Sequence, residues 1–293
     1  MSEGLISFTK MHGLGNDFMV LERITQSFEL THDLVKLLGD RHLGVGFDQL
    51  LLVEAPDRPD ADFKYRIYNS DGSEVEQCGN GARCFARFVI ERGLSFKRKL
   101  AVETACGLIY LTITDSGLVS VDMGHPEFAL KSLPFVPLGA PDSEGRYVLS
   151  AGTDSAAFYL VSMGNPHAVT LVDDVLSAPV SRFGSQIVSH PTFPKQVNVG
   201  FMQIVNPSSI RLRVYERGAG ETQACGTGAC AAVVAGVRMG LVKSGKPVDV
   251  QLYGGRLQIE WSEGKPVIMT GPTERVFDGQ LDLMRLRAMA NAL

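Results

Sequence analysis

Two segments of the chain have a helical pattern of apolar residues, and each begins just after a cysteine. The first, after Cys78, places apolar residues at helical spacing at Ala82, Phe85, Ala86, Val89 and Ile90. The second, after Cys225, is apolar on nearly every side, with the equivalent positions held by Ala229, Ala232, Val233, Gly236 and Val237. Gly93 and Gly240 are suitable C-terminal stops. A helix that is apolar all round must be enclosed, so the pattern predicts a central helix wrapped by strands.

Alternating apolar and polar residues predict strands elsewhere. Residues 211–215 alternate, and residues 248–252 and 257–261 alternate on either side of a Gly254-Gly255 turn, which is typical of a hairpin. The last thirteen residues, 281–293, have the composition of a helix that packs back on the first half. The Pro- and Gly-rich stretch 133–145 is the best candidate for a connection between halves.

The chain contains an internal repeat. The strings CGNGARCFARFV, from Cys78, and CGTGACAAVVAG, from Cys225, lie 147 residues apart, and HGLGNDFMV and VSMGNPHAV repeat upstream at a similar offset. We therefore predict an α+β fold of two pseudosymmetric halves, each a curved mixed or antiparallel sheet around a central apolar helix, with the active site in the cleft between them. The expected boundaries are 1–125, completed by 274–293, for the first half and 126–273 for the second.

Composition excludes several classes of protein. The 293 residues carry 28 basic and 32 acidic side chains, a net charge of −4, so no basic excess indicates binding to nucleic acid or to an anionic membrane. The longest strongly apolar run, 229–237, is too short to span a bilayer, and the N-terminus lacks the pattern of a secretory signal. We expect a cytoplasmic protein.

The five cysteines show neither a CxxC pair nor zinc-ligand spacing. Cys78 and Cys225 each precede glycine, a polar residue, glycine and a helix, which places the thiol at the positive end of the helix dipole. Such a position binds anions and depresses the pKa of a thiol. Cys84 and Cys230, inside the helices, and Cys106 are interpreted as structural.

Two matched thiols suit the inversion of a stereocentre. One thiolate removes a proton from one face of a carbon while a thiol delivers a proton to the other face. Helix N-termini aimed at the adjacent carboxylate stabilise the developing negative charge. No lysine motif for pyridoxal phosphate and no metal cluster is evident in the sequence, which fits a reaction without a cofactor or metal.

The motifs NSDGSEVEQCGNGAR and ERGAGETQACGTGAC closely resemble the signatures of the diaminopimelate epimerase family. MHGLGNDF, GVGFDQLLLVE, GNPHAV, VNVGFMQI and MTGPTERVFDG match in the family's order, so the resemblance covers nearly the whole chain. It implies interconversion of LL- and meso-diaminopimelate in lysine and peptidoglycan precursor biosynthesis, with two pseudosymmetric halves and a homodimer. Phe47 departs from the pattern, because a small residue is expected there.

The resemblance also implies roles for individual residues. Cys78 and Cys225 would be the acid/base pair, with Cys78 acting on the LL isomer and Cys225 on the meso isomer. The amides of Gly79, Asn80, Gly226 and Thr227 would bind the reacting carboxylate, and Asn16 and Gln49 would lie near it. The distal carboxylate would be held by Asn69, Asn165, Asn198 and Arg217, and the distal ammonium by Glu216. His167 and Glu216 would tune the thiols.

Two alternatives remain open at this point. One is a racemase of proline or hydroxyproline on the same scaffold, which would give no reason for Arg217 beside three asparagines. The other is a thiol redox switch in which Cys78 and Cys225 form a reversible disulfide.

Overall fold

The computed structural model describes residues 4–75 and 78–290, and the chain forms two compact units. The first contains the described residues up to Val121 and those from Gly271 onward, and the second contains Asp122–Thr270. The stretch 133–145, expected to connect the halves, instead lies inside the second unit. Its apolar residues Leu133 and Phe135 are buried in that unit's core, which explains why it is not a solvated linker.

The two units contain the same elements in the same order. In the first unit they are β1 (Leu5–Gly13), β2 (Asn16–Glu22), α1 (His32–Gly39), β3 (Gln49–Glu54), β4 (Phe63–Asn69), β5 (Glu74–Val75), α2 (Gly79–Glu91), β6 (Lys99–Thr104), β7 (Gly107–Ile113) and β8 (Val119–Asp122). In the second unit the corresponding elements are β10 (Asp154–Ser162), β11 (Pro166–Leu171), α3 (Val180–Val188), β12 (Asn198–Asn206), β13 (Ser209–Glu216), β14 (Gly220–Glu221), α4 (Gly226–Arg238), β15 (Val248–Leu252), β16 (Gly255–Glu260) and β17 (Ile268–Gly271). The predicted α+β duplication is confirmed.

Strand pairing repeats as well. The second and third strands of each series, β2 with β3 and β11 with β12, run parallel. The pairs β4 with β6 and β13 with β15 are also parallel, whereas the successive pairs β1–β2, β3–β4 and β6–β7 and their counterparts are antiparallel. The predicted hairpin is confirmed, but its two-residue turn is Tyr253-Gly254 rather than Gly254-Gly255, because Gly255 already pairs with Leu252 as the first residue of β16.

In each unit, the first of the ten repeated elements pairs with a strand that follows the last repeated element of the other unit along the chain. The chain continues from β8 through η1 (Leu130–Ser132) to β9 (Tyr147–Ala151), which pairs antiparallel with β10. It continues from β17 to β18 (Glu274–Asp282), which pairs antiparallel with β1. The strands β9 and β18 are therefore also equivalent.

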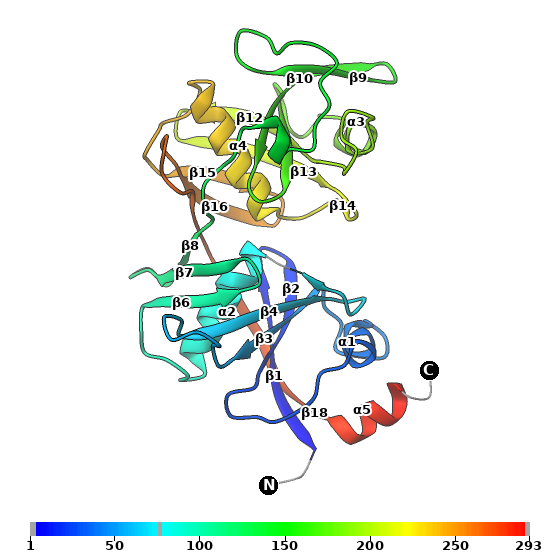
Figure 1. Ribbon diagram of the computed structural model, residues 1–293, viewed down its shortest axis with the longest axis vertical. Coiled ribbons are helices and arrows are strands. Elements are labelled where there is room, and N and C mark those ends of the chain that lie inside the picture. The colour runs from blue at the N-terminus through cyan, green and yellow to red at the C-terminus, as the bar shows by residue number, and fades with distance from the viewer. Residues whose placement is uncertain (1–3, 76–77, 291–293) are drawn as a thin grey trace. The chain divides into compact units, whose positions relative to one another are not determined.

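Helices cover both faces of the main sheet in the first unit. On one face, Met19, Leu50 and Leu52 pack in a cluster that also contains Leu34 and Leu38 of α1. The same cluster includes Leu283 of α5 (Leu283–Ala290), and Figure 1 shows α5 beside α1. Phe47, which departs from the expected small residue, is buried in this cluster too. The other face of the sheet packs against α2.

The second unit repeats this arrangement with a more apolar central helix. Residues 229–235 of α4 have no exposed surface, which confirms the prediction of an enclosed helix. The α3 helix covers the opposite face through Phe183, which packs against Phe158 and Phe201. Because both faces are covered there, β11 and the first half of β12 are buried without alternation, whereas β13, β15 and β16 keep the alternation that their sequences predict.

The two central helices end in the same way. Gly93 and Gly240 have φ angles of 68° and 71°, and each is followed by a backbone hydrogen bond that closes the last turn, from Leu94 to Val89 and from Leu241 to Gly236. The predicted stops are confirmed. Within the described residues, no helix has the length and hydropathy needed to cross a bilayer.

Candidate active site

Each of the two predicted cysteines is the N-cap of a central helix. Cys78 precedes α2 with extended backbone angles, and its sulfur accepts a hydrogen bond from the Gly81 amide at 3.3 Å. Cys225 precedes α4 in the same way and accepts from the Gly228 amide, also at 3.3 Å. Helix caps are usually the oxygen side chains of Ser, Thr, Asp or Asn. A thiol in this position is unusual, and the amide stabilises its deprotonated form.

The second glycine after each cysteine, Gly81 and Gly228, leaves little room for a side chain. Gly81 and Gly228 both lie in the first helical turn, where each packs against a strand. A Cβ on Gly81 would lie 2.3 Å from the hydroxyl oxygen of Tyr65, and one on Gly228 would lie 3.0 Å from a methyl carbon of Val214. Each helix therefore begins in direct contact with the strands that support it.

Two asparagines surround the thiol of Cys78. The thiol donates to Oδ1 of Asn16 at 3.8 Å, and the same oxygen accepts from Nδ2 of Asn80 at 3.3 Å. Asn80 is itself oriented by Arg83, a fully buried side chain that donates to Oδ1 of Asn80 at 3.0 Å. The structure thus brings together three of the predicted residues and adds Arg83.

Gln49 and Asn69 form a second amide pair in the first unit. They are directly opposite in the β3–β4 ladder, and Nε2 of Gln49 donates to Oδ1 of Asn69 at 3.1 Å. Asn69 donates in turn to Oγ of Ser73 at 3.1 Å. The buried Oε1 of Gln49 has no hydrogen-bond partner among the described residues, which is unusual for a buried polar atom.

Cys225 has different polar neighbours. Its sulfur lies 3.6 Å from the hydroxyl oxygen of Thr227, which accepts from Nδ2 of Asn165 at 3.4 Å. Oδ1 of Asn165 lies 3.0 Å from Nε2 of His167. An amide oxygen can only accept, so Nε2 of His167 carries the proton in this contact.

The remaining predicted residues of the second unit follow the ends of strands. Asn198, which pairs with His167 in the β11–β12 ladder, accepts a hydrogen bond from the Arg217 amide at 3.0 Å. Glu216 is the last residue of β13, and Thr222, which the sequence interpretation missed, donates its hydroxyl to the Glu216 carboxylate. This carboxylate also interacts with the thiol of Cys225.

Electrostatics at Cys225 differ from the prediction. Burial raises its pKa well above the ordinary thiol value, the negative charge of Glu216 raises it further, and the hydrogen bonds from Thr227 and Gly228 only partly offset this. The prediction of a depressed pKa was therefore wrong for Cys225. Burial, with a smaller contribution from Arg217, lowers the pKa of His167 to about 3, so its imidazole is neutral near pH 7.

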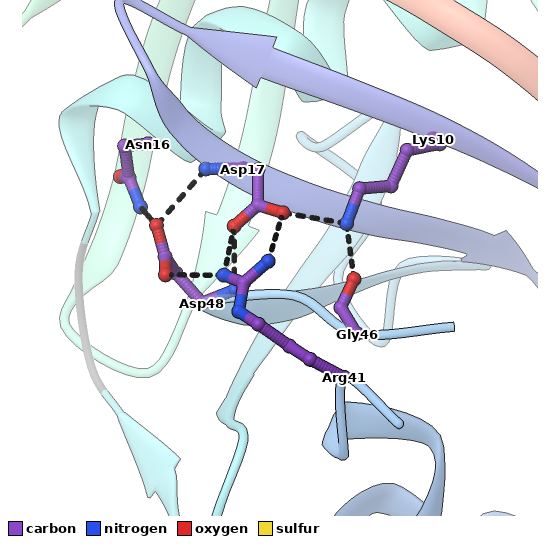
Figure 2. Close-up of polar contacts among 6 residues, drawn as sticks. All are labelled: Lys10, Asn16, Asp17, Arg41, Gly46 and Asp48. Atoms are coloured by element: carbon purple, nitrogen blue, oxygen red, sulfur yellow. Dashed lines mark hydrogen bonds and ion pairs between the residues drawn. The ribbon is translucent and has the colours of Figure 1, made fainter. Parts of the chain in front are cut away.

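A charged network behind Asn16 was not predicted (Figure 2). It consists of Lys10, Asp17, Arg41 and Asp48. Two of these residues could have been suspected from the sequence, because Asp17 directly follows Asn16 and Asp48 directly precedes Gln49. Lys10 and Arg41 have no such signal. Across the described chain, no group of three or more His, Cys, Asp or Glu side chains is arranged to hold a metal ion.

Solved structures share this fold. A hydroxyproline epimerase from Agrobacterium vitis aligns with a TM-score of 0.66 over 96% of this chain and 94% of its own, at 17% sequence identity. A probable proline racemase from Agrobacterium radiobacter K84 aligns with a TM-score of 0.68 over 98% and 95%, at 18% identity. The chain therefore has the fold of this epimerase and of this probable racemase.

Sequence similarity identifies the particular family. The model of the diaminopimelate epimerase family matches residues 8–129 and 159–276. Diaminopimelate epimerase of Psychrobacter arcticus is 59% identical, covering 98% of this chain and 97% of that protein, and the Acinetobacter baumannii (strain AYE) enzyme of the same name is 56% identical over 95% and 98%. The chain belongs to the diaminopimelate epimerase family, which confirms the resemblance found in its motifs and decides against the proline-type alternative.

Proposed function

We propose that this chain is an isomerase that interconverts LL- and meso-diaminopimelate without a cofactor, in the biosynthesis of lysine and of peptidoglycan precursors. Cys78 and Cys225 are its two bases in this scheme. The observation that carries the proposal is the equivalence of the two thiols. In a duplicated chain of this family, both cap the central helix of their unit and both accept from the third amide of that helix at 3.3 Å.

A pair of bases meets the chemical requirement of inversion. The thiolate takes the α-proton from one face and the thiol on the opposite face returns one, so neither has to move around the carbon. In the forward direction Cys78 deprotonates the LL isomer, and in reverse Cys225 deprotonates the meso isomer. The amides of Gly79, Asn80, Gly226 and Thr227, at the starts of α2 and α4, stabilise the charge that develops on the carboxylate.

The neutral and charged side chains have separate tasks in this proposal. Asn16 and Gln49 lie near the reacting end, where the unpartnered oxygen of Gln49 suits an ammonium donor. Arg217, Asn69, Asn165 and Asn198 hold the distal carboxylate, and Glu216 holds the distal ammonium. A planar guanidinium suits a bidentate contact with a carboxylate. The buried neutral His167 orients Asn165.

We further propose a homodimer in the cytoplasm, where thiols remain reduced. The surface of the first unit has exposed apolar side chains at Leu5, Val276, Phe277 and Met284. They lie on or next to the paired strands β1 and β18, and Val276 and Phe277, which are adjacent on β18, are the side chains that we expect to contact a second copy of the chain. Sedimentation of the wild-type protein and of Phe277→Glu tests this, with a shift of the variant to monomer expected and an unchanged mass contradicting it.

The activity is tested by incubating the reduced protein with LL-diaminopimelate in D₂O and no added cofactor. We expect deuterium at one α-carbon and appearance of the meso isomer, followed by NMR and chiral chromatography. The absence of both, in protein with intact thiols, would refute the proposed function. Turnover of proline in place of diaminopimelate would assign the chain to another substrate.

A further inference from the structure

The side-chain amide of Asn16 is hydrogen-bonded to the carboxylate of Asp48 on the side away from Cys78. Nδ2 of Asn16 donates to Oδ2 of Asp48 at 2.9 Å, while Oδ1 of Asn16 faces the thiol of Cys78 and Nδ2 of Asn80. An ionised carboxylate only accepts hydrogen bonds, so the nitrogen of the Asn16 amide must face Asp48. The oxygen is therefore the end that faces the thiol.

The Asp48 carboxylate is itself hydrogen-bonded to two other partners (Figure 2). Its Oδ1 pairs with Arg41 at 2.9 Å, and its Oδ2 also accepts from the Asp17 amide at 3.1 Å. Asp17 receives two further hydrogen bonds from Arg41, at 2.8 and 3.0 Å, and one from the Asp48 amide at 2.9 Å. Lys10 completes the network by donating to Asp17 at 2.6 Å and to the carbonyl of Gly46.

The charges of this network balance. Two carboxylates, Asp17 and Asp48, face two cations, Lys10 and Arg41. The four side chains contact one another as well as the backbone of β2 and of the segment before β3, so Asp48 meets Asn16 from a site with several anchors. The network therefore holds the Asp48 carboxylate where it accepts a hydrogen bond from the Asn16 amide.

We propose that Asp48 is a positioning residue, whose carboxylate fixes the Asn16 amide so that its oxygen, and not its nitrogen, faces the Cys78 thiol. An oxygen acceptor favours the protonated form of a thiol, so the contact sets how readily Cys78 gives up its proton. The consequence for catalysis rests on the proposed function, whereas the effect on the thiol does not.

The test compares Asp48→Ala, Asp48→Asn, Asn16→Ala and the double variant Asn16→Ala/Asp48→Ala. The first readout is the rate at which iodoacetamide alkylates Cys78 near neutral pH, measured by peptide mass spectrometry on the substrate-free protein. The second is kcat against KM for deuterium exchange into diaminopimelate. Thermal unfolding of each variant reports whether the fold survives.

We expect Asp48→Ala to raise the alkylation rate of Cys78 and to lower kcat, each by about three- to tenfold, the range that one hydrogen bond accounts for. Asp48→Asn should fall between wild type and Asp48→Ala, because its one amide oxygen can still accept from Asn16 but its amide nitrogen then faces the donor Arg41. The double variant should match Asn16→Ala, since Asp48 acts through Asn16. Asp115→Ala, which removes a carboxylate from the exposed pair with Arg98 in the same unit, should change neither rate.

Three results would overturn the proposal: no effect of Asp48→Ala, additive effects in the double variant, or equal effects of Asp48→Asn and Asp48→Ala. The last would assign the effect to charge alone. Should the alkylation rates follow the expected pattern while the wild-type protein exchanges no deuterium, the positioning role stands and the proposed function fails.

Discussion

Asn16 and Asn165 occupy equivalent positions in the two units but present opposite ends of their amides to the helix cap. Asn16 faces Cys78 with its oxygen, whereas Asn165 donates its nitrogen to the hydroxyl of Thr227, the neighbour of Cys225. Their anchors explain the difference, because the Asp48 carboxylate accepts from the first and the His167 imidazole donates to the second. Duplication preserved the framework of strands and caps, while the polar partners of each thiol diverged.

Loss of either cap thiol should stop epimerisation. Cys78→Ala and Cys225→Ala each remove one of two bases, so we expect at least about a hundredfold loss of conversion, the usual contribution of a positioned acid or base. The measurement is chiral chromatography of the product. Cys106→Ala, at the exposed turn before β7, is the matched control and should keep wild-type activity. Full activity in either cap variant would exclude the two-base scheme.

Glu216→Gln should lower the pKa of Cys225. Burial is the larger cause of the raised pKa and remains, but the variant removes the negative charge that raises it further. At a fixed pH below the pKa, the alkylation rate of Cys225 should rise by about tenfold for each unit by which its pKa falls. The rate is measured by peptide mass spectrometry after alkylation of the folded protein. Glu221→Gln removes a carboxylate that pairs with Arg213 and is the control. A slower reaction in Glu216→Gln would contradict this assignment.

His167 should make the fold sensitive to acid. In the folded chain its pKa is about 3 because it is buried, whereas the unfolded chain titrates near 6.5. Between these values the unfolded chain binds a proton that the folded chain does not, so the free energy of unfolding falls as the pH drops from about 6.5 toward 3. Urea titrations of wild type and His167→Gln across this window should show a shallower pH dependence in the variant, and equal slopes would contradict the prediction.

Gly81→Ala should destabilise the first unit. The added Cβ would lie 2.3 Å from the Tyr65 hydroxyl oxygen, an overlap that forces the helix or strand to shift, at a cost of about 1–3 kcal/mol. That hydroxyl has no hydrogen-bond partner among the described residues, so Tyr65→Phe should be tolerated and should partly restore Gly81→Ala. Gly139→Ala, with no atom within 4 Å of its Cβ, is the control. Denaturation midpoints of the wild type and the four variants decide, and an undiminished defect in the double variant would point to another cause.

The sequence was a good guide to what depends on neighbouring residues. The period of apolar residues, the stops at Gly93 and Gly240 and the hairpin at Gly254 are local, so they could be predicted from the residues alone. The repeat of the Cys78 and Cys225 motifs likewise predicted the duplication, because equivalent sequences form equivalent elements. The repeat could not show that β9, which follows β8, pairs with β10, or that β18, which follows β17, pairs with β1.

The sequence by itself determined the duplicated α+β architecture, the family and the place of both thiols at helix starts, since each depends on local pattern or on whole motifs. Only the tertiary structure decided the polar surroundings of those thiols. Asn16 meets Asp48 across 32 positions of sequence and Cys78 across 62, and whether an amide presents oxygen or nitrogen depends on such partners. The raised pKa of Cys225 has the same origin, because burial and the charge of Glu216 outweigh the helix N-terminus once the chain is packed.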